Sequence, residues 1–190
     1  MMKNNNVEIR KTQQLSSDDN RKISGYAMLF NSQSEDLGFF EVIEPSAIDV
    51  DTIKRSDIFA KFNHQDDIIL ARCKYGEGSL NLTIDDNGLF YEFEAPKTTY
   101  GDMLLEHIKR GEITSSSFAF SVANGGDKWV KKDGEMYRTI SKIEVLYDVS
   151  PVFQPAYEAT TCTMRNFEKA QKEIEINEKL DEIESEIILL

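Results

Sequence analysis

A run of small hydroxyl residues is the first feature of this sequence that could carry chemistry. Thr114-Ser115-Ser116-Ser117 leads directly into Phe118-Ala119-Phe120. On an extended strand, Ser117 and Ala119 would face one side of the sheet and the two phenylalanines the other. Small neighbours would leave room for a substrate beside the Ser117 hydroxyl, and the aromatic rings would hold the strand rigidly. Taken alone, the run also fits an ordinary polar strand face.

The sequence holds two histidines, and their surroundings differ. His64 lies in Phe62-Asn63-His64-Gln65-Asp66-Asp67, where an apolar strand is expected to end and a polar turn to begin. A histidine in that position is partly exposed and can exchange protons near neutral pH, although an inert surface histidine would look the same. His107 shares the apolar face of an expected helix, so we expect it to be packed, hydrogen-bonded and inert.

Composition excludes several classes of protein. The 190 residues suffice for one domain with a hydrophobic core, since 40% are hydrophobic and 29% charged. Twenty-two basic and 34 acidic residues give a net charge of −12, which suits contact with a nucleic-acid phosphate backbone poorly. Two cysteines and two histidines argue against a zinc or iron site, and no glycine-rich phosphate loop occurs. We therefore expect no cofactor, no metal and no nucleic-acid partner.

The sequence has no features of a membrane protein. No window approaches the run of about 18 apolar residues that is needed to cross a bilayer. The N-terminal residues Met1-Met2-Lys3-Asn4-Asn5-Asn6 are not followed by the apolar stretch of a signal peptide. We expect a soluble, acidic, intracellular protein that does not bind membranes.

Short strands separated by polar turns dominate the chain up to about residue 150. This pattern predicts a mainly antiparallel sheet that closes into a barrel or sandwich. Segments 7–10 and 23–30 could pair as a hairpin, and Asn87-Gly88 favours a tight hairpin between two later strands. The expected strands are 7–10, 23–30, 39–43, 58–62, 68–75, 79–84, 89–93, 113–122, a short one around Trp129, and 137–146.

Two helices are expected. The first begins after the N-cap candidates Thr98 and Thr99 and ends before Gly111, a residue type favoured just after a helix C-terminus. The second covers Asn166–Leu190, which holds eight acidic and three basic residues. Its apolar residues are spaced 4, 3, 4, 3, which gives about two heptads; they are Ile176, Leu180, Ile183, Ile187 and Leu190. This acidic amphipathic helix, residues 166–190, would either dock on the domain formed by residues 1–165 or serve in oligomerisation or cargo anchoring.

Short motifs occur in a fixed order along residues 7 to 165. They are Gly25-Tyr26-Ala27-x-x-Phe30-Asn31, Phe40-x-x-Ile43-x-Pro45, Asn63-His64, Leu70-x-Arg72, Thr98-x-x-Gly101, Arg110-Gly111-x-Ile113-x-x-x-Ser117-Phe118-x-Phe120, Asp148-Val149-Ser150-Pro151-Val152 and Pro155-Ala156-Tyr157. Taken in this order, the motifs resemble the HK97-type prohead (capsid maturation) proteases of tailed phages. The resemblance implies an α+β fold, namely a mainly antiparallel closed β-barrel with surrounding helices like that of herpesvirus assemblin.

The same resemblance implies a serine endopeptidase and assigns roles to its residues. Ser117 would be the nucleophile and His64 the general base. Assemblins use a second histidine placed after the serine, whereas His107 precedes it, so a carboxylate would have to orient His64. Asp148 fits the motif position of an acid, and Glu144 is the second choice. Arg165 would be an additional helper.

The biological role implied by the resemblance is phage capsid maturation. The enzyme would cleave the scaffolding segment of the major capsid protein, and also itself. Its partners would be major capsid protein and scaffold subunits, and it would form a homodimer or higher homo-oligomer inside the prohead, in the host cytoplasm. The alternative is a non-catalytic capsid-assembly or scaffolding protein that keeps the barrel and binds through the acidic helix.

Overall fold

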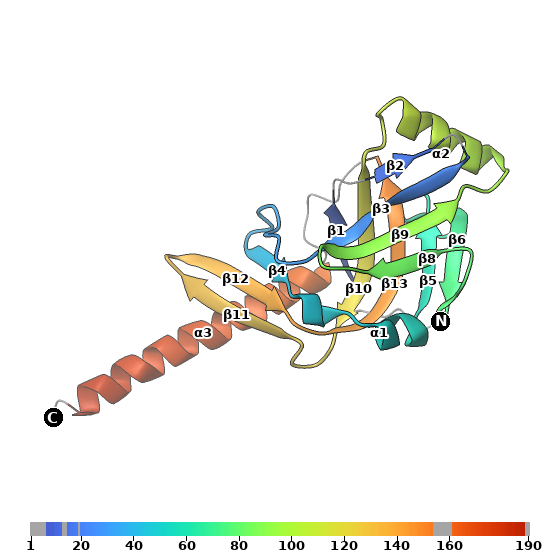
Figure 1. Ribbon diagram of the computed structural model, residues 1–190. Coiled ribbons are helices and arrows are strands. Elements are labelled where there is room, and N and C mark those ends of the chain that lie inside the picture. Colours follow the sequence, from blue (N-terminus) through green and yellow to red (C-terminus); the bar gives the residue numbers. More distant parts are fainter. Residues whose placement is uncertain (1–6, 13–14, 19, 154–160, 189–190) are drawn as a thin grey trace.

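The computed structural model describes residues 7–12, 15–18, 20–153 and 161–188, and within them the chain forms a mixed α+β structure (Figure 1). Its helices are α1 (Val50–Arg55), α2 (Thr99–Lys109) and α3 (Thr161–Ile188), with a 3₁₀ turn at Pro45–Ala47. The strands are β1 (Glu8–Thr12), β2 (Leu15–Ser17), β3 (Lys22–Leu29), β4 (Phe40–Ile43), β5 (Asp57–Lys61), β6 (Ile69–Lys74), β7 (Glu77–Gly78), β8 (Asn81–Ile84), β9 (Gly88–Glu94), β10 (Ser115–Val122), β11 (Asp127–Lys132), β12 (Glu135–Ile140) and β13 (Ile143–Val152).

Three sheets are built from these strands. The largest has the order β1-β10-β13-β5-β6-β7, in which β10 lies between β1 and β13, and β13 runs parallel to β5. A four-stranded sheet has the order β2-β3-β9-β8, and a three-stranded sheet joins β11, β12 and β4. Because β10, β13 and β5 are neighbours, residues more than 50 positions apart in sequence meet in the middle of the largest sheet.

One main core lies between the large sheet and the four-stranded sheet. It contains fully buried side chains from both, among them Ile23 and Leu89 of the four-stranded sheet and Phe120 and Leu146 of the large one. The β10 residues are buried from Ser115 to Ser121, since neighbouring strands flank β10 on both sides. The burial of apolar side chains around β10 fixes the strand that carries the hydroxyl run.

The structure confirms the mixed α+β class and the predominance of antiparallel pairing. Strand pairing among the described residues gives three sheets, so the closure of the strands into a single barrel is not confirmed. The expected hairpin of segments 7–10 and 23–30 is wrong, because β1 pairs with β10 while β3 pairs with β2 and β9. The hairpin of β8 and β9 is confirmed.

The expected strand 137–146 is also wrong, because the chain turns at Ser141 and Lys142. Both of these backbone N–H groups donate to the carbonyl oxygen of Gly126, at 2.8 and 3.0 Å. The turn divides the segment into β12, which belongs to the small sheet, and β13, which belongs to the large one. This division places the second half of the segment next to β10.

Helix α2 forms where the sequence predicted it. The Thr98 side chain accepts a hydrogen bond from the Gly101 N–H, and Gly111 follows the helix with a φ of +71°. The short helix α1 was not expected from the sequence; its N-cap is Asp49, whose side chain accepts from the Thr52 N–H.

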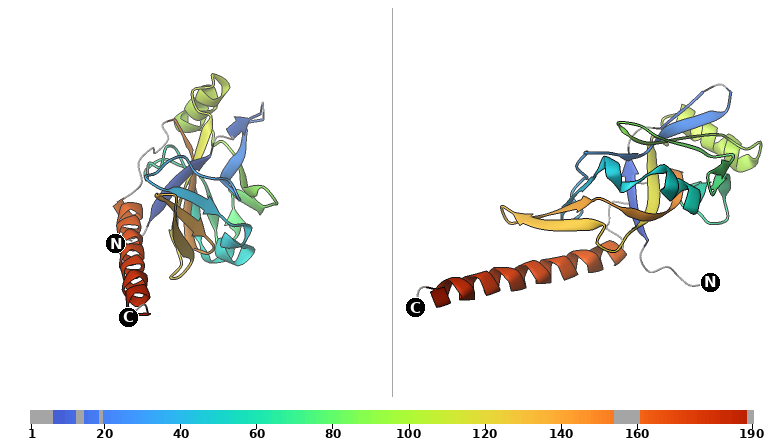
Figure 2. Two further views of the ribbon diagram at one scale, coloured as in Figure 1. Left: turned by 90° about the vertical axis from the view of Figure 1, so that its left-hand side faces the viewer. Right: turned by 60° about the horizontal axis from the view of Figure 1, so that its bottom comes forward.

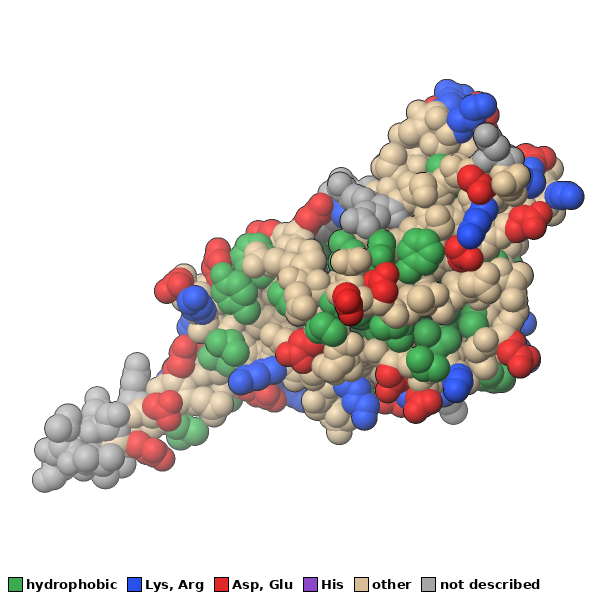
Figure 3. All heavy atoms as spheres, in the orientation of Figure 1, with side chains coloured by type: hydrophobic (Ala, Val, Ile, Leu, Met, Phe, Trp, Pro, Cys, Tyr) green, Lys and Arg blue, Asp and Glu red, His purple; other side chains and the backbone are tan. Residues whose placement is uncertain are grey.

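Helix α3 docks on the sheets near its start and is exposed farther along. Near its start, Phe167, Ala170 and Ile174 pack against a small apolar cluster that contains Phe39 and Trp129. Farther along, the helix extends away from the sheets (Figures 1 and 2), and acidic side chains line its visible face (Figure 3). The heptad residues Ile176, Leu180 and Ile183 are 57%, 51% and 52% exposed.

The helix begins at Thr161, so the expected boundary between residues 165 and 166 falls inside it. The Pro155-Ala156-Tyr157 motif, the side chain of Ile187 and Leu190 lie outside what the structure describes. Among the described helices, none combines the length and the apolar composition that a membrane span requires.

Candidate active site

The structure brings together the serine, the histidine and the aspartate singled out from the sequence. His64 Nε2 lies 2.7 Å from Ser117 Oγ, and His64 Nδ1 lies 2.8 Å from Asp148 Oδ1. An ionised carboxylate can only accept, so Nδ1 carries the proton and Nε2 presents a lone pair to the Ser117 hydroxyl. Glu144, the other candidate carboxylate, has an exposed side chain four residues earlier on β13.

Ser117 occupies the middle of the largest sheet. It pairs with Lys11 of β1 on one side and with Ser150 of β13 on the other. The rings of Phe118 and Phe120 stack with centroids 5.1 Å apart, and both side chains are buried. The strand is therefore fixed by packing and by pairing on both edges, which leaves the Ser117 side chain little freedom to move.

His64 sits on a tight turn between β5 and β6. The Gln65 N–H donates to the Phe62 carbonyl oxygen at 3.0 Å, and the two residues between them, Asn63 and His64, have φ angles of 51° and 59°. These features define a type I′ turn. Left-handed conformations are uncommon for residues other than glycine and cluster at functional sites, although Asn and His tolerate them better than most residues.

The turn is anchored to the strand that carries the aspartate. The Asn63 N–H donates to the carbonyl oxygen of Pro151 at 3.0 Å, and Asp148 pairs with Phe59 in the parallel β5–β13 ladder. Strand pairing and this hydrogen bond together set the distance between His64 and Asp148. The sequence predicted a polar turn after the strand, but not the left-handed conformation of His64 or the hydrogen bond to Pro151; Asn63, a residue favoured at positive φ, was a local signal for the turn geometry.

Asp148 is buried and has two further polar neighbours. The hydroxyl of Ser150 donates to Asp148 Oδ1 at 3.0 Å, and the Lys61 Nζ lies 3.6 Å from Asp148 Oδ2. Asp148 and Ser150 are 4% and 0% exposed, whereas the His64 side chain is 21% exposed. These groups hold the carboxylate in one orientation. Sequence reasoning missed both neighbours, although Ser150 lies two residues after Asp148 and hence on the same strand face.

Strand β1 covers the Ser117 hydroxyl. Ser117 is only 1% exposed, and its Oγ lies 2.7 Å from the carbonyl oxygen of Arg10 in β1. The hydroxyl has one proton and two acceptors within reach, His64 Nε2 and this carbonyl oxygen. Strand β1 therefore leaves Ser117 almost no exposure to solvent.

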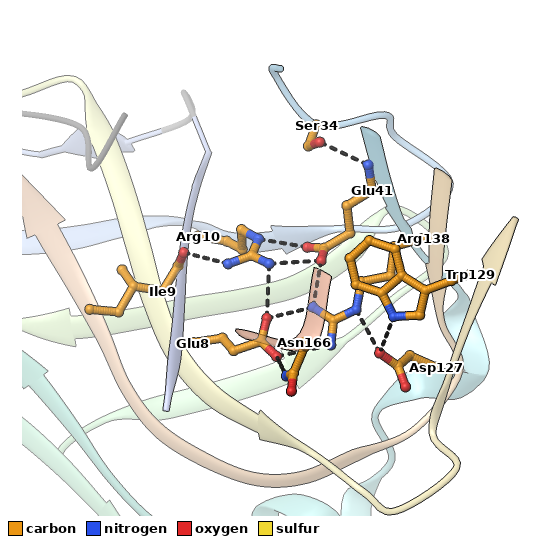
Figure 4. Close-up of polar contacts among 9 residues, drawn as sticks. All are labelled: Glu8, Ile9, Arg10, Ser34, Glu41, Asp127, Trp129, Arg138 and Asn166. Atoms are coloured by element: carbon orange, nitrogen blue, oxygen red, sulfur yellow. Dashed lines mark hydrogen bonds and ion pairs between the residues drawn. The ribbon is translucent and has the colours of Figure 1, made fainter. Parts of the chain in front are cut away.

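A second buried polar cluster lies on the other face of β1 (Figure 4). The Arg10 guanidinium donates to both Glu41 carboxylate oxygens at 2.6 and 2.7 Å, and Arg138 donates to Glu8 at 2.5 and 2.9 Å and to Glu41 at 3.0 Å. Asp127 accepts from Arg138 at 2.7 Å. Burial alone would lower the pKa of Arg138, but the carboxylates of Glu8, Glu41 and Asp127 raise it above its usual value, so the guanidinium stays charged.

The remaining residues considered in the sequence lie apart from this site. His107 was expected to be packed, but its side chain is 37% exposed; it is hydrogen-bonded, to Glu112 at 2.5 Å. Arg165 is exposed near the start of α3. Within the described parts of the chain, no group of three or more His, Cys, Asp or Glu side chains is arranged to hold a metal ion.

The geometry is that of a serine, a histidine and an aspartate joined by hydrogen bonds, the arrangement used by serine hydrolases. Residues 5–173 match the profile of the caudovirus prohead serine proteases, and the chain belongs to that family. The resemblance noted in the sequence is thus confirmed. Family membership makes the chain a phage capsid maturation protease that associates with capsid proteins inside the prohead in the host cytoplasm.

Among solved structures, the chain is similar to the capsid assembly protease gp21 of bacteriophage T4. The two are 11% identical in sequence, with a TM-score of 0.49, and the match covers 79% of this chain and 98% of that one. No curated protein matches the chain.

Proposed function

We propose that the chain is a serine endopeptidase in which Ser117 is the nucleophile, His64 the general base and Asp148 the residue that orients His64. The observation that supports these roles best is the unbroken series of hydrogen bonds from Asp148 through both His64 nitrogens to the Ser117 hydroxyl. His64 takes the hydroxyl proton as Oγ bonds to the peptide carbonyl carbon, and Asp148 stabilises the imidazolium. The C–N bond then breaks, and the proton passes to the leaving amine.

The acyl-enzyme formed in this way reacts with water, which His64 activates in turn. The proposed substrate is the scaffolding segment of the major capsid protein, and the natural partners are major capsid protein and scaffold subunits. The proposed enzyme needs no cofactor and works as a homodimer or higher homo-oligomer. We also propose that its strands close into a barrel like that of assemblin.

Self-cleavage is also part of the proposed function. The carbonyl oxygen of Arg10 already contacts Ser117 Oγ, so the Arg10–Lys11 peptide bond is the bond of this chain that we propose is cut. Attack on the Arg10 carbonyl carbon would release the segment that ends at Arg10 and create a new amino terminus at Lys11. Removal of that segment would uncover Ser117 for other substrates.

The test is incubation of the major capsid protein with the wild-type chain and with the Ser117→Ala variant, followed by intact mass measurement of both proteins. We expect the wild type to trim the capsid protein and to lose its own segment up to Arg10, and the variant to do neither. Undiminished cleavage by the variant would reject Ser117 as the nucleophile. Binding of capsid protein without cleavage by the wild type would favour the non-catalytic assembly protein.

A further inference from the structure

Strand β1 lies against β10 in the way that a bound peptide lies against the edge of a sheet. Its pairing is antiparallel and continuous, from Glu8 opposite Phe120 to Thr12 opposite Ser116. Peptides that add to a sheet edge gain affinity from main-chain hydrogen bonds and selectivity from the sites that receive alternate side chains. If β1 occupies the substrate position, the receptors of its side chains are also the receptors of the substrate's side chains; this step rests on the function proposed above.

The receptor of the Arg10 side chain is Glu41. This carboxylate belongs to β4, is 3% exposed, and binds the Arg10 guanidinium through both of its oxygens. The guanidinium also lies 5.7 Å from the centre of the Phe120 ring. A planar fork with two donors matches this geometry, whereas a lysine ammonium reaches a carboxylate only as a point charge. Glu41 is held in turn by its own N–H, which donates to Ser34 Oγ at 2.9 Å.

The receptor of the Glu8 side chain is Arg138, which is 1% exposed and belongs to β12. It donates to Glu8 through both terminal nitrogens while Asp127 accepts from its Nε. Glu8 and Arg10 are two positions apart, so they face the same side of β1. When β1 leaves, Glu41 loses the Arg10 guanidinium and Arg138 loses the Glu8 carboxylate, while Arg138 keeps its bonds to Glu41 and Asp127.

We infer that the substrate supplies the same two charges: the enzyme cleaves after arginine, and it favours an acidic residue two positions before that arginine. Glu41 is the residue that selects the arginine, and Arg138 selects the acid. A neutral residue in place of the arginine would remove the two hydrogen bonds to Glu41, and a neutral residue in place of the acid would remove those to Arg138, which disfavours binding. An acidic residue in place of the arginine would meet Glu41 directly and be rejected most strongly.

The experiment uses the full chain and peptides that contain the β1 sequence Val7-Glu8-Ile9-Arg10-Lys11-Thr12 between a fluorophore and a quencher. Three further peptides replace the arginine by lysine, the arginine by glutamine, or the glutamate by glutamine. We expect kcat/KM to fall about 10- to 100-fold when arginine becomes glutamine, as for loss of a charged hydrogen-bonded pair. The kcat/KM of the lysine peptide should be intermediate. Replacement of the glutamate by glutamine should lower kcat/KM about tenfold.

The decisive variant is Glu41→Gln, and the readout is the ratio of kcat/KM for the arginine and glutamine peptides within each protein. This ratio is independent of how much of the protein is folded or has released β1. In Glu41→Gln the ratio should collapse towards one, while Glu94→Gln, which removes an exposed carboxylate at the end of β9, should keep the wild-type ratio. The termini created in the major capsid protein, read by mass spectrometry, should follow the same acid-x-arginine pattern.

Equal cleavage of the arginine and glutamine peptides by the wild type, or an unchanged ratio in Glu41→Gln, would overturn the inference while cleavage itself stands. Cleavage of the major capsid protein with none of the peptides cut would overturn it as well. If neither capsid protein nor any peptide is cleaved, the proposed protease function fails, and the specificity fails with it.

Discussion

The two polar clusters that meet at β1 are both buried, yet they are built differently. The first is a single line of hydrogen bonds from Asp148 through His64 to Ser117, and its middle member, His64, is partly exposed. The second joins Arg10 and Arg138 to three carboxylates by paired, charge-assisted bonds. The line can pass a proton, whereas the second cluster keeps its charges fixed.

Arg10 belongs to both clusters through different atoms. Its carbonyl oxygen contacts Ser117, and its guanidinium binds Glu41. The ion pairs thus hold β1 over Ser117, at the end of the line of hydrogen bonds from Asp148 and His64. This comparison predicts that changes in the line reduce the cleavage rate at little cost in stability, while changes in the ion-pair cluster reduce stability or alter specificity.

The largest expected effect on rate is that of Ser117→Ala. Loss of the nucleophile should lower kcat on the order of 10⁶-fold, leaving only the contribution of binding and oxyanion stabilisation. Peptide cleavage and thermal unfolding should be measured on the same preparation, with an unchanged melting temperature expected. Ser121→Ala removes another buried hydroxyl from β10 and serves as the control; a similar loss in that variant would point to damage of the strand rather than of the chemistry.

Asp148→Asn should have the next largest effect. An amide at this position favours the wrong histidine tautomer, and a loss of about 10⁴-fold in turnover is typical. Glu144→Gln should be mild and His107→Gln nearly silent, because both side chains are partly or fully exposed away from the line. Full activity of Asp148→Asn, combined with a loss in either of the other two variants, would contradict the assignment of Asp148 and leave the Ser117–His64 pair intact.

On the other side of the comparison, Arg138→Leu should mainly destabilise the fold. The substitution leaves the Glu8 and Glu41 carboxylates buried without this guanidinium, and breaking a buried pair in this way costs about 3–5 kcal/mol. The free energy of unfolding from denaturant titration measures the effect. The exposed pair Lys131–Glu178 provides the contrast, since Lys131→Met should change stability by no more than about 1 kcal/mol. Equal stability of the two variants would contradict the prediction that changes in the ion-pair cluster reduce stability.

Ser150→Ala tests how firmly the line is held at its buried end. The variant removes the hydroxyl that donates to Asp148 Oδ1, so the carboxylate loses one of the contacts that orient it towards His64. We expect turnover to fall about tenfold, the equivalent of one hydrogen bond of about 1.4 kcal/mol, with KM unchanged. Ser150→Thr keeps the hydroxyl and should recover most of the activity; no recovery would indicate a packing effect instead.

The sequence identified the members of the line but not what surrounds them. Each of the three residues stood in a motif, and the order of the motifs was enough to identify them; they are Ser117, His64 and Asp148. The covering of Ser117 by β1 depends on a pairing across 107 positions, and strand alternation says nothing about which partner a strand chooses. The expected hairpin failed for that reason: local pattern favoured the nearer strand, while burial of the Arg10 and Glu8 side chains against Glu41 and Arg138 favours β10.

Removal of the exposed part of α3 should have the smallest effect on the enzyme itself. The docked residues Phe167, Ala170 and Ile174 pack on the small apolar cluster, and the Asn166 side chain donates to Glu8 at 3.3 Å, so a deletion that begins at Asn166 would disturb both the fold and β1. A deletion of residues 176–190 spares these contacts and removes heptad residues that are about half exposed. Peptide cleavage and melting temperature should therefore stay at wild-type values, while incorporation into proheads, followed by co-sedimentation, should fall if the exposed stripe binds a partner helix. Normal incorporation would assign the partner contacts to the sheets, and a lower melting temperature would show that the distal helix also stabilises the domain.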